Sequence, residues 1–597
     1  MMHPHLDYGA IGNGRVLALV GPDSGIDWLC LPRFDSASVF ARILDTEKGG
    51  TFLIRPESGI VRGDWKYVRN TNVLRGVFES GDASWEIIDF APRMVKGHGY
   101  DAPVELVRIV RPLKGAPRIV VEFDPRPDYA RVTPRLLEVG DSIMVEGSHV
   151  PLRLMTDAPI PFITQRMPLT LTQPYVFVLS TNPSREQVRA SEANFMLEET
   201  IAGWRQYART LALPGFADEH VIRSALCLAL HANVDTGGII AAATTSIPEA
   251  LNTPRTWDYR YCWLRDAAFV VEALRRVSKT EIGEHFVKFL RHVAEAGPLQ
   301  PLYGVAGERE LPEVTLDHLA GFGGTGPVRV GNAAALQQQN DLNGELLLCL
   351  DSMLGDPRVV LDDAESWYPL VQRLVEEAIT IAPQPDTGIW EFRSILRHYT
   401  FSRAMCWAAM ERGAAIARRL GHHEDAARWA AHARREQEVV LSRGYSEKWG
   451  CFTQALDGQW ADAANLLFPS MGIIDARDSR FQNTLADYEK RLVRGGLMLR
   501  YVNEDDFGET TSAFTICSFW WAESLALSGR LDDAIALFNR LLRFSNPLGL
   551  YSEDVEPETG QLLGNFPQAY THVGLIHAAV TIGELLAARE GRVRAWA

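Results

Sequence analysis

The stretch ADEHVIRSALCLALHAN, residues 217–233, is where the hydrophobic pattern of this 597-residue chain changes period. Its apolar residues recur every three or four positions, as on the buried face of an amphipathic helix. Ten further segments of this kind follow, in pairs joined by short turns, and residues 461–474 are a weaker candidate for a twelfth. Their mutual similarity is too weak for a TPR or ankyrin array. Six helical hairpins closed into a toroid therefore fit this half better than an open solenoid.

The first third of the chain has a different pattern. Short β-rich segments, such as RIVVEFDP (118–125) and YVFVLST (175–181), are separated by Gly, Pro and Asp. This spacing is typical of an antiparallel sandwich. A helical segment at 191–211 follows, which we expect Pro214 and Gly215 to end. We therefore predict a multidomain chain: a β-sandwich domain over 1–194, a linker helix over 195–215 and an all-α barrel over 216–597.

Bulk properties exclude several classes of protein. The net charge of −15 argues against a nucleic-acid partner, because phosphate binding needs a basic face. We find no run of about 18 apolar residues and no signal peptide, and so expect neither a membrane partner nor export. The seven cysteines are scattered without a C-x-x-C pair, and the histidines lack ligand spacing. We expect a cytoplasmic protein with no metal or other cofactor.

Aromatic and charged residues are concentrated in TWDYRYCWLRDAAF, residues 256–269, directly before an apolar helical run. One interpretation is a core helix with an ion pair at its start. The other is a sugar pocket, in which Arg265 and Asp266 hold adjacent hydroxyls while Tyr259 and Trp263 lie against the C–H face of the ring.

Two loops carry carboxylates suited to acid–base chemistry. In PDTGIWEFR (385–393), Glu391 follows Ile389 and Trp390, and apolar neighbours raise the pKa of a carboxyl group. In the loop 548–572, Glu553 precedes Asp554 and polar turn residues. We expect this setting to be more exposed to water than that of Glu391, and to keep the Glu553 carboxylate ionised. One protonated and one ionised carboxyl group hydrolyse glycosidic bonds. On spacing alone, two solvent-exposed loop carboxylates remain the alternative.

Several motifs in the same order resemble glycoside hydrolase family 15, which contains glucoamylases, glucodextranases and bacterial trehalases. They include TWDYRYCWLRDA, VRVGNAAALQQQNDLNGE, GIWEFR, GLMLRY and SEDVEPETGQLLGNFPQAYTH, and the resemblance covers nearly the whole chain. It implies a super-β-sandwich followed by an (α/α)6 barrel, with inverting hydrolysis that releases β-glucose from a non-reducing end.

The resemblance also implies roles for individual residues. Glu391 falls at the position of the general acid and Glu553 at that of the base. Substrate-binding positions fall on Tyr259, Trp263, Arg265, Asp266, Asp341, Trp390 and Arg500. Asp341 is equally well placed to cap the helix that follows it. Phe392 and Arg393 follow Glu391, whereas fungal glucoamylases carry a second carboxylate directly after the acid, so we expect different subsites beyond the first glucose.

We therefore predict an inverting, exo-acting α-glucoside hydrolase whose partner is a short α-gluco-oligosaccharide. The alternative within the family is a trehalase acting on α,α-trehalose. A transglucosylase and a non-catalytic sugar-binding protein are weaker alternatives. The sequence defines neither the preferred linkage nor whether the chain forms a homo-oligomer.

Overall fold

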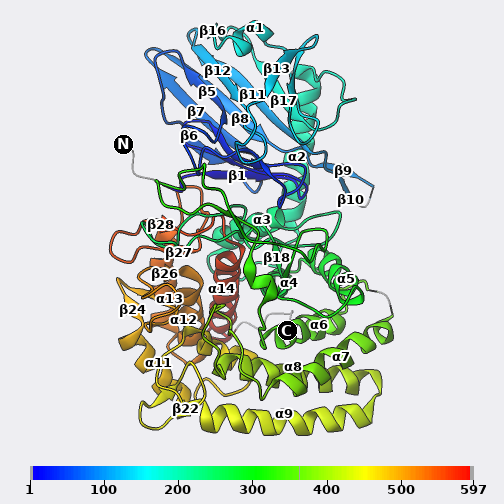
Figure 1. Ribbon diagram of the computed structural model, residues 1–597, viewed down its shortest axis with the longest axis vertical. Helices are drawn as coiled ribbons and strands as arrows, with labels where there is room; N and C mark the ends of the chain where they lie inside the picture. The colour runs from blue at the N-terminus through cyan, green and yellow to red at the C-terminus, as the bar shows by residue number, and fades with distance from the viewer. Residues whose placement is uncertain (1–4, 98, 362, 592–597) are drawn as a thin grey trace.

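The computed structural model describes residues 5–97, 99–361 and 363–591. Two antiparallel sheets occupy one end of the molecule, and a body of helices occupies the other (Figure 1). The predicted order, a β-sandwich followed by an all-α barrel, is confirmed.

The two sheets of the sandwich are antiparallel throughout. The first has the strand order β1-β2-β3-β5-β12-β16 with β4 beside β3, and the second has the order β13-β14-β15-β17-β11-β8-β7-β6. Their bounds are β1 Gly9–Gly12, β2 Leu17–Val20, β3 Ile26–Cys30, β4 Ser38–Phe40, β5 Thr51–Pro56, β6 Asp64–Tyr67, β7 Leu74–Ser80, β8 Ala83–Phe90, β11 Glu105–Lys114, β12 Arg118–Asp124, β13 Arg135–Glu138, β14 Ser142–Glu146, β15 Arg153–Thr156, β16 Leu169–Thr170 and β17 Tyr175–Ser180. Strands β9 (Met94–Lys96) and β10 (Gly99–Asp101) form a separate hairpin, and α1 spans Ile160–Thr164.

An ion pair is buried in the sandwich. Arg108 and Asp89 have no exposed surface and form two hydrogen bonds, each of 2.9 Å. Arg108 also donates to the carbonyl oxygens of Phe52 and Ser24, so that its charge is satisfied from the opposite sheet as well. Burial nevertheless raises the pKa of Asp89.

Helix α2 (Ala190–Arg209) joins the sandwich to the barrel (Figure 1). It begins five residues before the expected linker and ends at Arg209, before Pro214 and Gly215. The Thr210 hydroxyl donates to the carbonyl of Tyr207, in the last turn, and the Ala212 N–H donates to the carbonyl of Val277. The Ala212 bond ties the chain to the barrel before Pro214 is reached.

Helices of the barrel alternate between an outer and an inner ring. The outer helices are α3 Asp218–His231, α5 Glu281–Glu295, α7 Tyr368–Ile381, α9 His423–Arg443, α11 Ser479–Arg491 and α13 Leu531–Leu541. The inner helices are α4 Leu264–Arg276, α6 Leu342–Gly355, α8 Thr400–Leu420, α12 Thr515–Leu527 and α14 Ala569–Arg589. The weak twelfth segment takes the sixth inner position as a 3-10 turn, Ala463–Leu467, and the four-residue α10, Phe468–Met471.

Short strands pair in the loops at the barrel end where the inner helices begin. They are β18 Cys262–Trp263, β19 Leu302–Tyr303, β20 Val314–Thr315, β21 Arg329–Val330, β22 Tyr445–Ser446, β23 Cys451–Phe452, β24 Val493–Arg494, β25 Leu497–Met498, β26 Ala513–Phe514, β27 Asp554–Val555 and β28 Leu562–Leu563. By length and composition α14 is apolar enough to cross a membrane, yet 72% of its most apolar window is buried inside the protein. This is the burial that an inner barrel helix requires.

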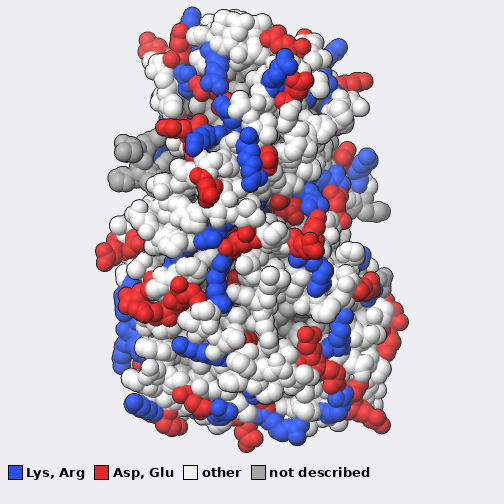
Figure 2. All heavy atoms as spheres, in the orientation of Figure 1, with Lys and Arg blue, Asp and Glu red and all other residues white. Residues whose placement is uncertain are grey.

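All seven cysteines are buried and unpaired. Within residues 5–97, 99–361 and 363–591, no group of three or more His, Cys, Asp or Glu side chains is arranged to hold a metal ion. Acidic and basic side chains are interspersed over the face seen in Figure 2.

Candidate active site

A cavity lies at the end of the barrel where the inner helices begin. Its wall comes from five loops, those between α3 and α4, α5 and α6, α7 and α8, α11 and α12, and α13 and α14. Seven of the nine predicted site residues line it: Tyr259, Trp263, Arg265, Asp266, Trp390, Glu391 and Arg500. The remaining two, Asp341 and Glu553, are fully buried behind the wall.

Glu391 is held in place by its backbone and by one side of its carboxylate. Its φ angle of 60° is in the left-handed region, which non-glycine residues adopt at a cost and which is enriched at functional sites. Oε1 accepts hydrogen bonds from Trp263 Nε1 at 2.7 Å, and from Arg265 Nη2 and Gln339 Nε2 at 3.2 Å each. In the described chain no protein group donates to Oε2, so this oxygen is left for a ligand in the cavity.

Arg265 and Asp266 occupy the first turn of α4. Arg265 bonds to Asp266 Oδ2 at 3.2 Å through Nε and to the carbonyl of Ile389 at 3.1 Å through Nη1. Burial raises the pKa of Asp266 to about 6, against the opposing effect of Arg265. The pair therefore lies in the pocket wall, as the sugar-pocket interpretation predicts, and Arg265 joins it to Glu391.

Asp341 lies behind Arg265 rather than in the wall. Its carboxylate is 3.8 Å from Arg265 Nη1 and has no exposed surface. It does not cap α6 either, since no described N–H of that helix bonds to its side chain. The Asp341 carboxylate is therefore placed to act as a counter-charge for Arg265. It is not placed to contact a sugar directly or to cap the helix.

Trp390 is fixed by a hydrogen bond and by edge-on and tilted aromatic rings. Its Nε1 donates to Asp462 Oδ1 at 2.8 Å, and the pKa of Asp462 is raised by burial to about 6. The rings of Tyr501, Phe514 and Trp520 lie within 6.2 Å of its centroid. This packing fixes the residue next to Glu391.

Glu553 is not in the wet setting that its sequence neighbours predict. Tyr259 donates to Oε1 at 2.7 Å and the backbone N–H of Asn565 donates to Oε2 at 3.2 Å. Gly564, at φ 70°, lies so close that a Cβ there would be 2.6 Å from the Glu553 Cβ. Burial, then Asp554 and Glu249, raise the pKa of Glu553 well above its ordinary value. Its contact with the cavity is through Tyr259.

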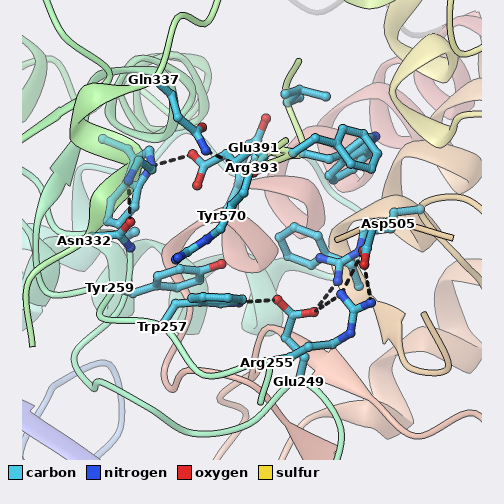
Figure 3. A pocket seen from close by; sticks show the side chains of 18 of the residues that line it. Glu249, Arg255, Trp257, Tyr259, Asn332, Gln337, Glu391, Arg393, Asp505 and Tyr570 are labelled. Atoms are coloured by element: carbon cyan, nitrogen blue, oxygen red, sulfur yellow. Dashed lines mark hydrogen bonds and ion pairs between the residues drawn. The ribbon is translucent and has the colours of Figure 1, made fainter. Parts of the chain in front are cut away.

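A second charged group in the wall was predicted only in part, since the sequence pointed to Arg500 but not to Glu249, Arg255 or Asp505. We call these four residues the acid–arginine cluster. Glu249 pairs with Arg500 and accepts a 2.8 Å bond from Trp257 Nε1, and Arg255 forms two bonds to Asp505 at 2.6 and 2.8 Å. In Figure 3 Glu249, Arg255 and Asp505 lie below Glu391, and Trp257 reaches Glu249 from the side of Tyr259.

Sequence profiles place the chain among known proteins. The profile described as "Glycosyl hydrolases family 15" matches residues 215–580, which include the whole cavity wall. The chain belongs to glycosyl hydrolases family 15. This family 15 protein is therefore a glycoside hydrolase. A second profile, "Trehalase-like, N-terminal", matches residues 6–162 in the sandwich.

Curated relatives cover nearly the full length of the family 15 chain. A trehalase of Mycobacterium tuberculosis is 34% identical over 97% of this chain and 89% of its own length. A trehalase of Thermoplasma volcanium is 31% identical over 99% of this chain and 96% of its own. Among solved structures, a bacterial glucoamylase complexed with acarbose matches with a TM-score of 0.71 and 14% identity, over 98% of this chain and 95% of that one. This last likeness supports the fold alone.

Proposed function

We propose that this protein hydrolyses α,α-trehalose to two molecules of glucose, with inversion at the carbon that water attacks. The curated relatives, trehalases matched over nearly their whole lengths, favour this substrate over the maltose-type oligosaccharides predicted first. Trehalose consists of two glucose rings joined through both anomeric carbons. A trehalose pocket therefore needs polar partners for the hydroxyl groups of both rings.

The observation that carries the proposal is that one cavity holds two separate polar groups. Arg265 and Asp266 adjoin Glu391, and the acid–arginine cluster faces the same space from other loops (Figure 3). The position after the acid, a carboxylate in fungal glucoamylases, is here Phe392, which is 3% exposed and stacks on Tyr399. Glu249 and Asp505 therefore supply carboxylates for the second ring from elsewhere in the chain.

Glu391 acts as the general acid in this proposal. Because Oε1 is occupied by N–H donors, the proton resides on Oε2 and passes to the glycosidic oxygen. The leaving glucose then departs as a neutral alcohol.

Glu553 acts as the general base. Its raised pKa makes it a stronger base while it is ionised. It takes a proton from a water bound beside the Tyr259 hydroxyl, which donates to Glu553 Oε1 and lines the cavity. Attack from the face opposite the leaving group converts the α-linkage to β-glucose.

A panel of α-linked glucose disaccharides tests the substrate. We expect kcat/KM for trehalose to exceed those for maltose and isomaltose by at least tenfold. A higher kcat/KM for maltose would refute the trehalase assignment. It would support instead the exo-acting glucosidase predicted from the sequence.

A further inference from the structure

A second cavity lies at the opposite end of the barrel bore, where the inner helices end. It holds about 1720 Å³ of space, including its mouth, and we call it the rear cavity. Much of its wall comes from inner helices α4, α6, α12 and α14, from Glu345 in the first turn of α6 to Arg276, Leu527 and Ala588 in the last turns of the other three. None of its lining residues belongs to the wall of the substrate pocket.

The short sixth inner segment accounts for this space. The five inner helices have 13 to 21 residues, whereas α10 has four. Pro469 at its start and Gly472 after it restrict the helix to one turn. One sixth of the inner ring is therefore too short to fill the bore to its end, and the cavity that results is lined by Leu467, Pro469, Ser470 and Met471.

Polar groups with unused hydrogen-bonding capacity line the rear cavity. Glu345 is 2% exposed, and its carboxyl group shares a hydrogen bond with that of Asp341, but in the described chain no N–H or hydroxyl group donates to either of its oxygens. The Nε2 atom of His577 is likewise buried without a partner. Buried polar atoms are normally satisfied, so two such groups at the inner end of one cavity point to a ligand that hydrogen-bonds there.

The charges of the wall favour a neutral ligand. Glu272 pairs with Arg275 at 2.7 Å, and Glu523 and Glu584 lie 3.6 and 3.2 Å from Arg276. Asp351 is matched in the same way by Arg412 and Arg419. The wall therefore retains little unpaired charge with which to hold an anion or a cation.

Phe269 adds an apolar surface at the inner end of the rear cavity. Its ring lies 5.3 Å from that of Tyr570, a residue of the substrate pocket, so this pair of rings separates the two cavities. An aromatic ring beside carboxyl, imidazole and hydroxyl groups is the combination that binds sugars and other polyols. We propose that the rear cavity binds a neutral polyhydroxy compound the size of a monosaccharide, with Glu345 and His577 as hydrogen-bond partners.

Three helices connect this site to the substrate pocket. Helix α4 carries Asp266 at the pocket and Phe269 at the rear, and α14 carries Tyr570 and His577 in the same way. Helix α6 places Glu345 one turn after Asp341, the counter-charge of Arg265. The two cavities are therefore lined by different turns of α4 and α14.

Equilibrium dialysis of the full chain with radiolabelled D-glucose tests this proposal, whichever disaccharide is the substrate. Because the substrate pocket can itself hold two glucose rings, the test is the difference between variants. We expect Ser352→Phe, which fills the rear cavity, to bind one glucose molecule fewer per chain than the wild type. Ser442→Phe on the exposed face of α9 is the matched control and should bind as many as the wild type.

His577→Phe covers the case in which Ser352→Phe fails to fold, because it preserves a ring and removes only the hydrogen-bonding nitrogens. We expect it to weaken the rear site at least tenfold without changing the pocket site. Equal glucose binding by Ser352→Phe and the wild type, or unchanged rear binding in His577→Phe, would overturn the proposal.

Discussion

Replacing Tyr259 by Phe removes a single hydroxyl group, the donor of the 2.7 Å bond to Glu553 Oε1. A hydrogen bond to a buried charged group contributes about 1.5–3 kcal/mol. Its loss therefore shifts the balance between the ionised and protonated forms of Glu553 by about 10- to 150-fold toward the protonated form. The pKa of Glu553, already raised by burial, rises further.

The consequence depends on pH in a defined direction. A base works when ionised, so activity is present above its pKa and is lost as the pH falls through it. We expect the acid limb of the kcat/KM profile to move to higher pH in Tyr259→Phe, with a loss of about tenfold or more on that limb and recovery at higher pH.

The assay is kcat/KM for trehalose between pH 4.5 and 9, with Tyr445→Phe as the control, since Tyr445 is not in the cavity wall. A loss that is equal at every pH, with the acid limb unmoved, would refute the reasoning. Tyr259 would then act only by contacting the sugar.

Three further predictions follow from the same geometry. Glu391→Gln should lose about 10²–10⁴-fold in activity on trehalose but retain more on α-glucosyl fluoride, whose leaving group needs no proton, whereas Glu553→Gln should lose activity on both substrates equally. Equal losses for the two variants on each substrate would contradict these roles. Glu249→Gln removes a negative neighbour of Glu553, so its acid limb should move to lower pH, opposite to Tyr259→Phe, and a shift upward would contradict the assigned electrostatics. Arg108→Met leaves Asp89 buried without its partner and should lower the free energy of unfolding by about 3–5 kcal/mol in denaturant titrations, and a loss below about 1 kcal/mol would show that the pair is dispensable.

Most of the fold could be predicted because it depends on local periodicity. The segment 217–233 contains α3 (Asp218–His231), and the other strongly periodic segments likewise contain helices. The exception is the segment 461–474, where Pro469 limits α10 to one turn. The end of α2 at Arg209, before Pro214 and Gly215, was not predictable, because it depends on the long-range hydrogen bond from the Ala212 N–H to Val277.

The residues of the candidate site could likewise be predicted only in part. Arg265 and Asp266 are adjacent in the sequence, so a motif could find them. Arg255 and Asp505 are 250 positions apart, and no local pattern relates them. The setting of Glu553 was predicted wrongly because its burial comes from Tyr259, in another loop, and from Gly564, further along its own loop, rather than from its immediate neighbours.

The anomeric form of the first products tests the central claim most directly. Inverting hydrolysis of α,α-trehalose by Glu391 and Glu553 yields one β-glucose, from the attacked ring, and one α-glucose, from the leaving ring. Proton NMR within the first minutes, before mutarotation, should therefore show α- and β-glucose in equal amounts. Initial release of α-glucose alone would show retention and contradict the account.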